Sequence, residues 1–269
     1  FPGELTDLML NNWDKRKYFI RQALFVLAIL FLVLALARPQ WGKKTEVAAQ
    51  KGIDVMIAID VSKSMLAQDL SPNRLENAKS SLNLIIDELA GNRIGLVAFA
   101  GTGFINCPLT TDVGAVKMFL KSIDTDLIPD PGTDIDSAIR ESIKAFGQST
   151  NSKVIILLTD GEELSGSALS AAEPAQTEGI RIFAVGIGSP EGAPIPAAGG
   201  FKKDEQGNLI MSRVYQELLN VLAEKTGGRS FLISQDRTGF QKLFAAIALL
   251  PRQRISQSMT YQYQDRFQI

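Results

Sequence analysis

The sequence predicts an α/β fold with a doubly wound, mostly parallel sheet, preceded by an N-terminal transmembrane helix. Three observations lead to this prediction. Between residues 52 and 250, short apolar runs alternate with longer amphipathic segments. The apolar runs are nearly continuous, which is typical of strands buried on both faces of a parallel sheet. Before them lies an apolar segment of about 20 residues, the length that an α-helix needs to cross a bilayer.

The apolar segment comes first along the chain and runs from Tyr18 to Ala37. Arg21 interrupts it near one end, where a long basic side chain can reach the lipid headgroups. Arg38 and Pro39 follow it, and helices usually end before a proline. We therefore predict a transmembrane helix over residues 18–38. A cleaved signal peptide is the alternative, although its apolar core would be shorter and closer to the N-terminus.

Two short segments flank this helix. Residues 1–17 place apolar side chains at helical spacing before three consecutive basic residues. This pattern is typical of an amphipathic helix on a membrane surface, and a plain linker is the alternative. Residues 39–50 are predicted to be a linker. Basic residues are slightly more frequent before the apolar core than after it, so the charge bias favours a cytoplasmic N-terminus and an exported C-terminal part.

An α/β domain is predicted over residues 51–250. Its strands are expected at 53–59, 94–99, 154–158, 182–185 and 230–233. Its helices are expected at 74–89, 112–123, 134–146, 167–178, 212–226 and 239–250. In these helical segments apolar residues recur at spacings of three and four, as on one face of a helix. Crossovers between the parallel strands should be right-handed.

One segment interrupts this alternation. Residues 188–210 are rich in glycine and proline and carry a charged run. We predict that they form a surface insertion, with a hairpin that turns near Gly207 and Asn208. After the last helix, residues 251–269 are polar and aromatic. They are expected to form a juxtamembrane segment or an additional strand.

The composition excludes several classes of function. The 269 residues contain no His and one Cys, which excludes His-based catalysis, His-ligated zinc and Cys-cluster metal sites. Cys107 is expected to be a buried, unreactive side chain, because no His is present to activate it. The formal net charge of −1 argues against electrostatic binding of nucleic acid.

Oxygen-bearing side chains follow two predicted strands and precede one predicted helix. Asp60, Ser62 and Ser64 follow the first strand, Thr133 precedes the helix at 134–146, and Asp160 follows the strand at 154–158. In open parallel sheets, ligands bind outside the carboxyl ends of the strands. No glycine-rich phosphate-binding loop accompanies these residues, which argues against nucleotide binding. Oxygen donors of this kind suit a hard divalent cation such as Mg²⁺ or Mn²⁺.

The balance of hydroxyls and carboxylates indicates what such a cation would do. Uncharged hydroxyls in the direct positions, with the aspartates acting through water or from outside, leave the cation electron-poor. It would then attract an acidic residue of a partner protein. Lys63, Met65 and Glu162 are expected at the rim of this site. Alternatively, Ser62 and Ser64 could merely cap the next turn.

The order of these five residues resembles the metal-ion-dependent adhesion site of the von Willebrand factor A domain. That family carries Asp-x-Ser-x-Ser, a later Thr, and then Asp in a Thr-Asp-Gly context. The matching residues here are Asp60, Ser62, Ser64, Thr133 and Asp160. The resemblance covers roughly residues 50 to 235 and implies a von Willebrand factor A, Rossmann-like fold. It also implies a protein-interaction module that binds Mg²⁺ or Mn²⁺ and is not an enzyme.

Features around the site resemble the Bat (aerotolerance) family of bacterial membrane proteins, BatA/BatB type. These features are residues 36–40, 52–56 and 74–79 together with the insertion. The resemblance implies an inner-membrane anchor, a periplasmic A domain, and a second transmembrane helix after residue 269. It also implies partnership with other Bat membrane proteins and a MoxR-type AAA+ ATPase, in a complex linked to stress tolerance.

The residues leave two other functions open. Asp60 could be an aspartyl nucleophile for Mg²⁺-dependent phosphoryl transfer. Enzymes of that kind usually carry a second Asp two residues further on, where this chain has Ser62. The domain could also be a structural scaffold that binds no metal. Partners could equally bind elsewhere, for example at the insertion 188–210 or the membrane helix.

Overall fold

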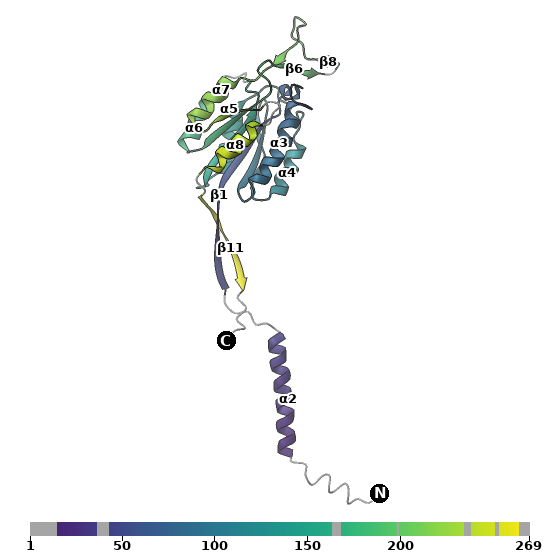
Figure 1. The fold of residues 1–269 in the computed structure, drawn as a ribbon, viewed down its shortest axis with the longest axis vertical. Helices are drawn as coiled ribbons and strands as arrows, with labels where there is room; N and C mark the ends of the chain where they lie inside the picture. The colour runs from purple at the N-terminus through teal and green to yellow at the C-terminus, as the bar shows by residue number, and fades with distance from the viewer. Residues whose placement is uncertain are drawn as a thin grey trace, which may run out of the picture. The chain divides into compact units, whose positions relative to one another are not determined.

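The computed structural model describes residues 15–36, 43–162, 168–197, 199–233, 238–250 and 253–263. The chain forms two compact units, and Figure 1 labels several of their elements. One unit comprises residues 1–48 and 257–269, and the other comprises residues 49–256. The region 51–250, which we predict to be the α/β domain, lies entirely within the second unit.

The predicted transmembrane segment is a single helix, α2, over Lys15–Leu36. The stretch Arg16–Leu36 is long and apolar enough to cross a membrane, with a mean hydropathy of 2.6, and it is not buried against the protein. Gln22 donates a hydrogen bond to the hydroxyl of Tyr18 at 3.1 Å, so this polar amide has a partner within the helix. The predicted amphipathic segment 1–17 lies mostly outside the described residues.

The first strand is longer than the sequence predicts. β1 runs over Lys43–Asp60 and so includes most of residues 39–50, which we expected to be a linker. β11, over Gln253–Tyr263, pairs with it. This pairing satisfies backbone groups through a partner about 200 residues away, which a local pattern cannot reveal. Over residues 253–263 the structure therefore shows the additional strand, and the juxtamembrane assignment stays a prediction.

The sheet of the α/β domain has the strand order β10-β5-β4-β1-β2-β3. All neighbouring pairs on this path are parallel except β2–β3. The strands that join β1 are β2 (Arg93–Phe99), β3 (Gly103–Thr110), β4 (Ser152–Thr159), β5 (Arg181–Ile187) and β10 (Ser230–Ile233). The prediction of a doubly wound, mostly parallel sheet is confirmed.

The antiparallel strand β3 is absent from the sequence prediction. Its sequence contains Pro108 and has no continuous apolar run, and a proline argues against a central strand. An edge strand tolerates proline because part of its backbone faces away from the ladder.

Cys107 in this strand is 1% exposed, and burial raises the pKa of its thiol. The prediction that Cys107 is a buried side chain is therefore confirmed.

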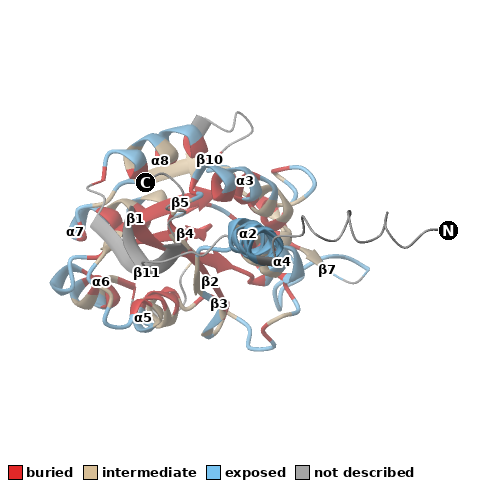
Figure 2. Ribbon diagram, turned by 90° about the horizontal axis from the view of Figure 1, so that it is seen from below, coloured by how far each residue is buried: buried red, intermediate tan, exposed pale blue. Residues whose placement is uncertain are grey.

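Helices cover both faces of the sheet (Figure 2). One face carries α3 (Arg74–Glu88), α4 (Val113–Ser122) and α8 (Thr238–Ala248). The other carries α5 (Ile135–Phe146), α6 (Ala168–Thr177) and α7 (Gln216–Lys225). Alternate residues of β1 enter the two cores, Val55, Ile57 and Ile59 on one side and Met56 and Ala58 on the other. This period of two follows from the pleat of a strand.

The segment between β5 and α7 is a folded insertion. β6 (Ala193–Pro194) pairs with β9 (Met211–Ser212), and β7 (Pro196–Ala197) pairs with β8 (Gly200–Phe201). A hairpin turn closes between Lys203 and Leu209, which form an isolated bridge, and Gly207 takes a positive φ there. The predicted turn near Gly207 and Asn208 is confirmed. Because β9 occupies residues 211–212, α7 begins later than predicted.

A buried ion pair between Asp54 and Arg93 lies near the point where β1 enters the α/β domain. Asp54 is fully buried and accepts a hydrogen bond from Arg93 Nε at 2.8 Å. Asn151 donates to the same carboxylate at 3.0 Å, and Ser149 also donates to it. Burial alone would raise the pKa of Asp54, but these hydrogen bonds hold it below its usual range. The group joins β1 and β2 to the turn that precedes β4, at the end of the sheet opposite to Asp60.

Candidate metal centre

The candidate site lies at the point where the strand order of the sheet reverses. The chain passes from β1 to β2 on one side, whereas β4 pairs with β1 on the other side. The carboxyl ends of β1 and β4 therefore meet at a topological switch point, where open α/β sheets bind ligands. Asp60 is the last residue of β1, and Asp160 directly follows β4. Both side chains are fully buried.

Hydrogen bonds hold both oxygens of Asp60. Its Oδ1 accepts from the backbone N–H of Ser62 at 2.8 Å, and its Oδ2 accepts from the hydroxyl of Thr159 at 2.6 Å. Burial, and secondly the negative charge of Asp160, raise the pKa of Asp60 to about 7. A cation beside the two carboxylates would relieve this repulsion.

The two serines meet just after β1. Ser64 lies in a short 3-10 helix over Lys63–Leu66, and Ser62 precedes it without making a side-chain cap hydrogen bond. The capping alternative is therefore wrong for Ser62. The two hydroxyls share a hydrogen bond of 2.9 Å, in which either oxygen can be the donor. Adjacent oxygen ligands of an octahedral Mg²⁺ at 2.0–2.1 Å are separated by about 2.9 Å, so the observed spacing fits one cation.

Thr133 reaches the same place from the loop before α5. The neighbouring Asp134 caps α5 by accepting from Ser137 N–H at 2.9 Å, and its own N–H donates to Ala100 just beyond β2 at 2.6 Å. These bonds hold the loop against the end of the sheet. Thr133, Ser62 and Ser64 line one cleft of about 300 Å³. The three hydroxyls that we predict to be metal ligands therefore share one cleft.

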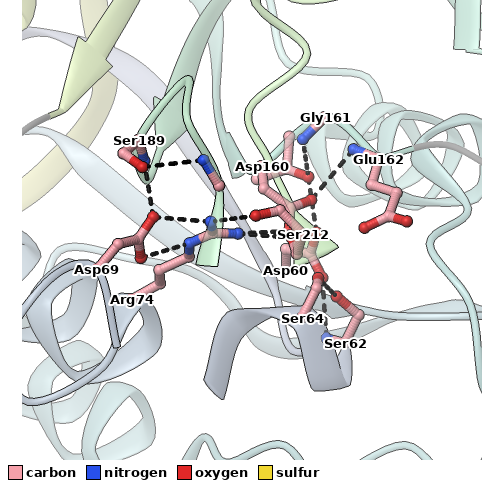
Figure 3. Close-up of polar contacts among 12 residues, drawn as sticks. Asp60, Ser62, Ser64, Asp69, Arg74, Asp160, Gly161, Glu162, Ser189 and Ser212 are labelled. Carbon is pink, nitrogen blue, oxygen red and sulfur yellow. Dashed lines mark hydrogen bonds and ion pairs between the residues drawn. The ribbon is translucent and has the colours of Figure 1, made fainter. Parts of the chain in front are cut away.

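Asp160 is held by a network that sequence reasoning missed (Figure 3). Its Oδ2 accepts from Arg74 Nη1 at 3.1 Å and from the hydroxyl of Ser212 at 3.0 Å. Arg74 is 0% exposed and also donates two hydrogen bonds of 2.8 Å to Asp69. The sequence carries one signal for Arg74. It is a basic residue in the first turn of α3, where the helix dipole disfavours positive charge.

The rim differs in part from the prediction. Lys63 is exposed, lines the cleft and forms an ion pair with Asp126. Glu162 is half-buried and also lines the cleft. Burial, and secondly the charge of Asp160, raise the pKa of Glu162. The expectation for Met65 is wrong, because its side chain is 0% exposed and packs in the core.

The donor set fits a hard divalent cation with few charged ligands. The hydroxyl residues Ser62, Ser64 and Thr133 line the cleft, and two buried carboxylates lie beside it. Within the described part of the chain, no three His, Cys, Asp or Glu side chains gather as a metal cluster. A soft or imidazole-bound metal would need such ligands, whereas Mg²⁺ takes one or two carboxylates, neutral oxygens and water.

Comparisons with known proteins identify a related domain and related chains. Residues 55–163 match the model of the von Willebrand factor type A domain. An uncharacterized protein of Borreliella burgdorferi is 32% identical over 243 residues, which cover 87% of this chain and 70% of that protein.

Solved structures also resemble the chain. The conserved hypothetical protein BatB from Bacteroides thetaiotaomicron is 37% identical with a TM-score of 0.70, covering 73% of this chain and 98% of that one. An aerotolerance-related membrane protein from Bacteroides fragilis is 36% identical with a TM-score of 0.70, covering 74% and 100%. Proximal thread matrix protein 1 of the mussel byssus, in a structure described with zinc in its MIDAS motif, shares the fold. It is 20% identical with a TM-score of 0.54, covering 76% and 47%.

Proposed function

This chain belongs to the Bat (aerotolerance) family of von Willebrand factor type A domain proteins, BatA/BatB type, and from that membership we propose its function. We propose a membrane-anchored interaction module that captures an acidic residue of a partner protein through a divalent cation. Mg²⁺ or Mn²⁺ would be held at the carboxyl ends of β1 and β4. The observation that carries this proposal is the convergence of Ser62, Ser64 and Thr133 on one cleft, beside two fully buried aspartates.

Each residue has a distinct part in this proposal. Ser62, Ser64 and Thr133 present neutral oxygens to the cleft and hold the ion directly. Asp60 and Asp160 lie beneath them, fully buried, and balance its charge from outside or through water. Bound there, the ion supplies an electron-poor coordination position that a partner's carboxylate can take. Arg74 and Thr159 keep the two aspartates in place through hydrogen bonds.

The site favours binding over catalysis. An aspartyl nucleophile must approach its substrate, but Asp60 is fully buried and both of its oxygens accept hydrogen bonds. The residue two positions further on is Ser62, which offers no carboxyl group for acid–base work. We therefore propose that the domain is not an enzyme. A scaffold that binds no metal is the other candidate, and metal titration distinguishes the two.

The test is Mg²⁺ calorimetry on the full chain in detergent, combined with partner capture from membranes. Ser64→Ala and Thr133→Ala should each weaken Mg²⁺ binding roughly tenfold and abolish capture. Ser80→Ala, an exposed serine of α3, serves as the matched control and should change neither. Chelation should release the captured partner.

Two results would contradict this proposal. Unchanged Mg²⁺ affinity in both variants would show that these hydroxyls do not hold the ion. Weakened Mg²⁺ binding with undiminished capture would show that the ion only stiffens these loops and that partners bind elsewhere.

The membrane arrangement is part of the proposal. α2 is long and apolar enough to cross a membrane, and a Bacteroides fragilis relative is described as a membrane protein. We propose that α2 anchors the chain in the inner membrane, with the A domain on the periplasmic side. Other Bat membrane proteins and a MoxR-type AAA+ ATPase are the proposed members of the complex.

A labelling experiment tests this topology. Asp204 is exposed in the insertion, so Asp204→Cys should react with an impermeant thiol reagent once the outer membrane is opened. Cys107 is buried and provides the unlabelled background in the parent chain. Reaction only after lysis of the inner membrane would place the domain in the cytoplasm.

A further inference from the structure

The geometry points to a specific kind of partner segment, and this inference rests on the proposed function. We propose that the cleft above the metal site recognises an extended peptide in which a Glu or Asp is flanked by large apolar residues. The insertion between β5 and α7 forms one wall of that cleft. It would determine which acidic segments are accepted.

Three insertion residues from three separate passes of the chain line the cleft. They are Ile195, Lys202 and Ile210. Their backbones form a closed set of hydrogen bonds: Ile195 N–H to Ile210 at 3.4 Å, Lys202 N–H to Ile195 at 2.8 Å, and Ile210 N–H to Lys202 at 2.9 Å. The insertion is thus folded so that two isoleucines and one lysine face the cleft together.

The base of the insertion is bonded to the site itself, as Figure 3 shows for part of this network. Arg74 donates to Ser212 at both its hydroxyl, at 2.7 Å, and its carbonyl, at 3.0 Å. Ser189 N–H donates to Asp69 at 2.7 Å, and Tyr215 N–H donates to the carbonyl of Asp160 at 2.8 Å. Both ends of the insertion are therefore anchored beside Asp160, so this wall has a defined position.

A second loop contributes further apolar residues to the cleft. Ile128, Pro129 and Pro131, in the loop that leads to Thr133, line the cleft. The cleft thus combines the three hydroxyls with apolar residues from two loops. Its volume of about 300 Å³ is at the lower end for ligand pockets, which range over about 300–1,000 Å³. That volume suits a few side chains of an extended segment.

The charges of the cleft favour an acidic occupant only when the ion is present. Its charged lining residues are Lys63, Lys202, Asp130 and Glu162, which sum to zero. The lysines therefore offset the repulsion that Asp130 and Glu162 would exert on an incoming carboxylate. The ion supplies the attraction, and Ile210, Pro129 and Pro131, which are not buried, supply apolar contact for the flanking residues.

Fluorescent pentapeptides with the central sequences Leu-Glu-Leu, Ser-Glu-Ser and Leu-Gln-Leu test this inference. Binding to the full chain in detergent is measured by anisotropy with Mg²⁺ and with chelator. We expect Leu-Glu-Leu to bind roughly tenfold more tightly than Ser-Glu-Ser. Leu-Gln-Leu should bind weakly, because it has no carboxylate for the ion.

Neighbouring residues of the insertion provide matched variants. Ile210→Asn should abolish the preference for Leu-Glu-Leu, whereas Leu209→Asn should keep it, because Leu209 is exposed and does not line the cleft. Lys202→Glu should weaken both acidic peptides through repulsion. Lys203→Glu, its exposed neighbour outside the cleft lining, should not.

The outcomes separate this inference from the proposed function. Normal Mg²⁺ titration with equal binding of Leu-Glu-Leu and Ser-Glu-Ser, or with no peptide binding, would overturn the inference alone. An unaltered preference in Ile210→Asn would also overturn it. Peptide binding that depends on Ile210 but not on Mg²⁺ would support the cleft as a peptide-binding site. It would also refute the metal-dependent function.

Discussion

Replacing Arg74 with methionine should lower the free energy of unfolding by about 3–5 kcal/mol, the cost of breaking a buried ion pair from one side. The guanidinium is fully buried between Asp69 and Asp160 and makes hydrogen bonds of 2.8–3.1 Å to their carboxylates. Methionine fills similar space but donates nothing, so Asp160 would stay buried without its cation. Chemical unfolding of the full chain in detergent, followed by circular dichroism, measures the loss.

The matched control is Arg140→Met. Arg140 also forms an ion pair with an aspartate, Asp136, but half of its side chain is exposed. Exposed pairs contribute little because water already solvates both charges, so this variant should unfold almost as the parent does. Equal stability of the two variants would contradict a structural role for the buried network. Arg74→Met should also weaken Mg²⁺ binding, because Asp160 loses a group that positions it.

Replacing Asp160 with asparagine should weaken Mg²⁺ binding by about 10- to 100-fold, the usual effect of losing a group that orients or neutralises a metal site. Asparagine keeps the shape, and its amide oxygen can still accept from Arg74 and Ser212 at the position of Oδ2. Alanine is a poorer test, because it would remove the partner of a buried arginine. Calorimetry on the folded variant gives the affinity.

Asp54→Asn is the control for this prediction. Asp54 is likewise fully buried and paired with an arginine, Arg93, but it lies six residues before Asp60 in β1, or about 20 Å along a strand. Its replacement should lower stability and leave Mg²⁺ affinity unchanged. Equal losses of affinity in both aspartate variants would indicate a general effect of destabilisation rather than a site at Asp160.

Much of the fold follows from local pattern. The apolar runs at 53–59 and 154–158 lie in β1 and β4, and the helix predicted at 134–146 is α5 with Asp134 as its cap. These predictions succeeded because strands buried on both faces need continuous apolar residues and covered helices need an apolar stripe. The prediction failed at β3 and at residues 43–50, where strand formation depends on a partner strand.

The sequence by itself determined which residues carry the candidate site. Asp60, Ser62 and Ser64 are neighbours along the chain, and strand order in a parallel fold sends Asp160 to the same edge. Oxygen donors that follow parallel strands are therefore recognisable from the order of residues alone. The sequence also determined the membrane-length helix, because helix length and hydropathy are local properties.

Only the tertiary structure decided what surrounds those residues. Asp69, Arg74 and Ser212 are separated by up to 143 residues along the chain, yet they meet in one network around Asp160. The apolar lining of the cleft comes from two loops that no local pattern joins, one with Ile128 and the other with Ile210. Such contacts depend on how distant segments of the chain pack together. The free-energy cost of burying a charge depends on the same packing, because packing decides which hydrogen-bond partners surround it.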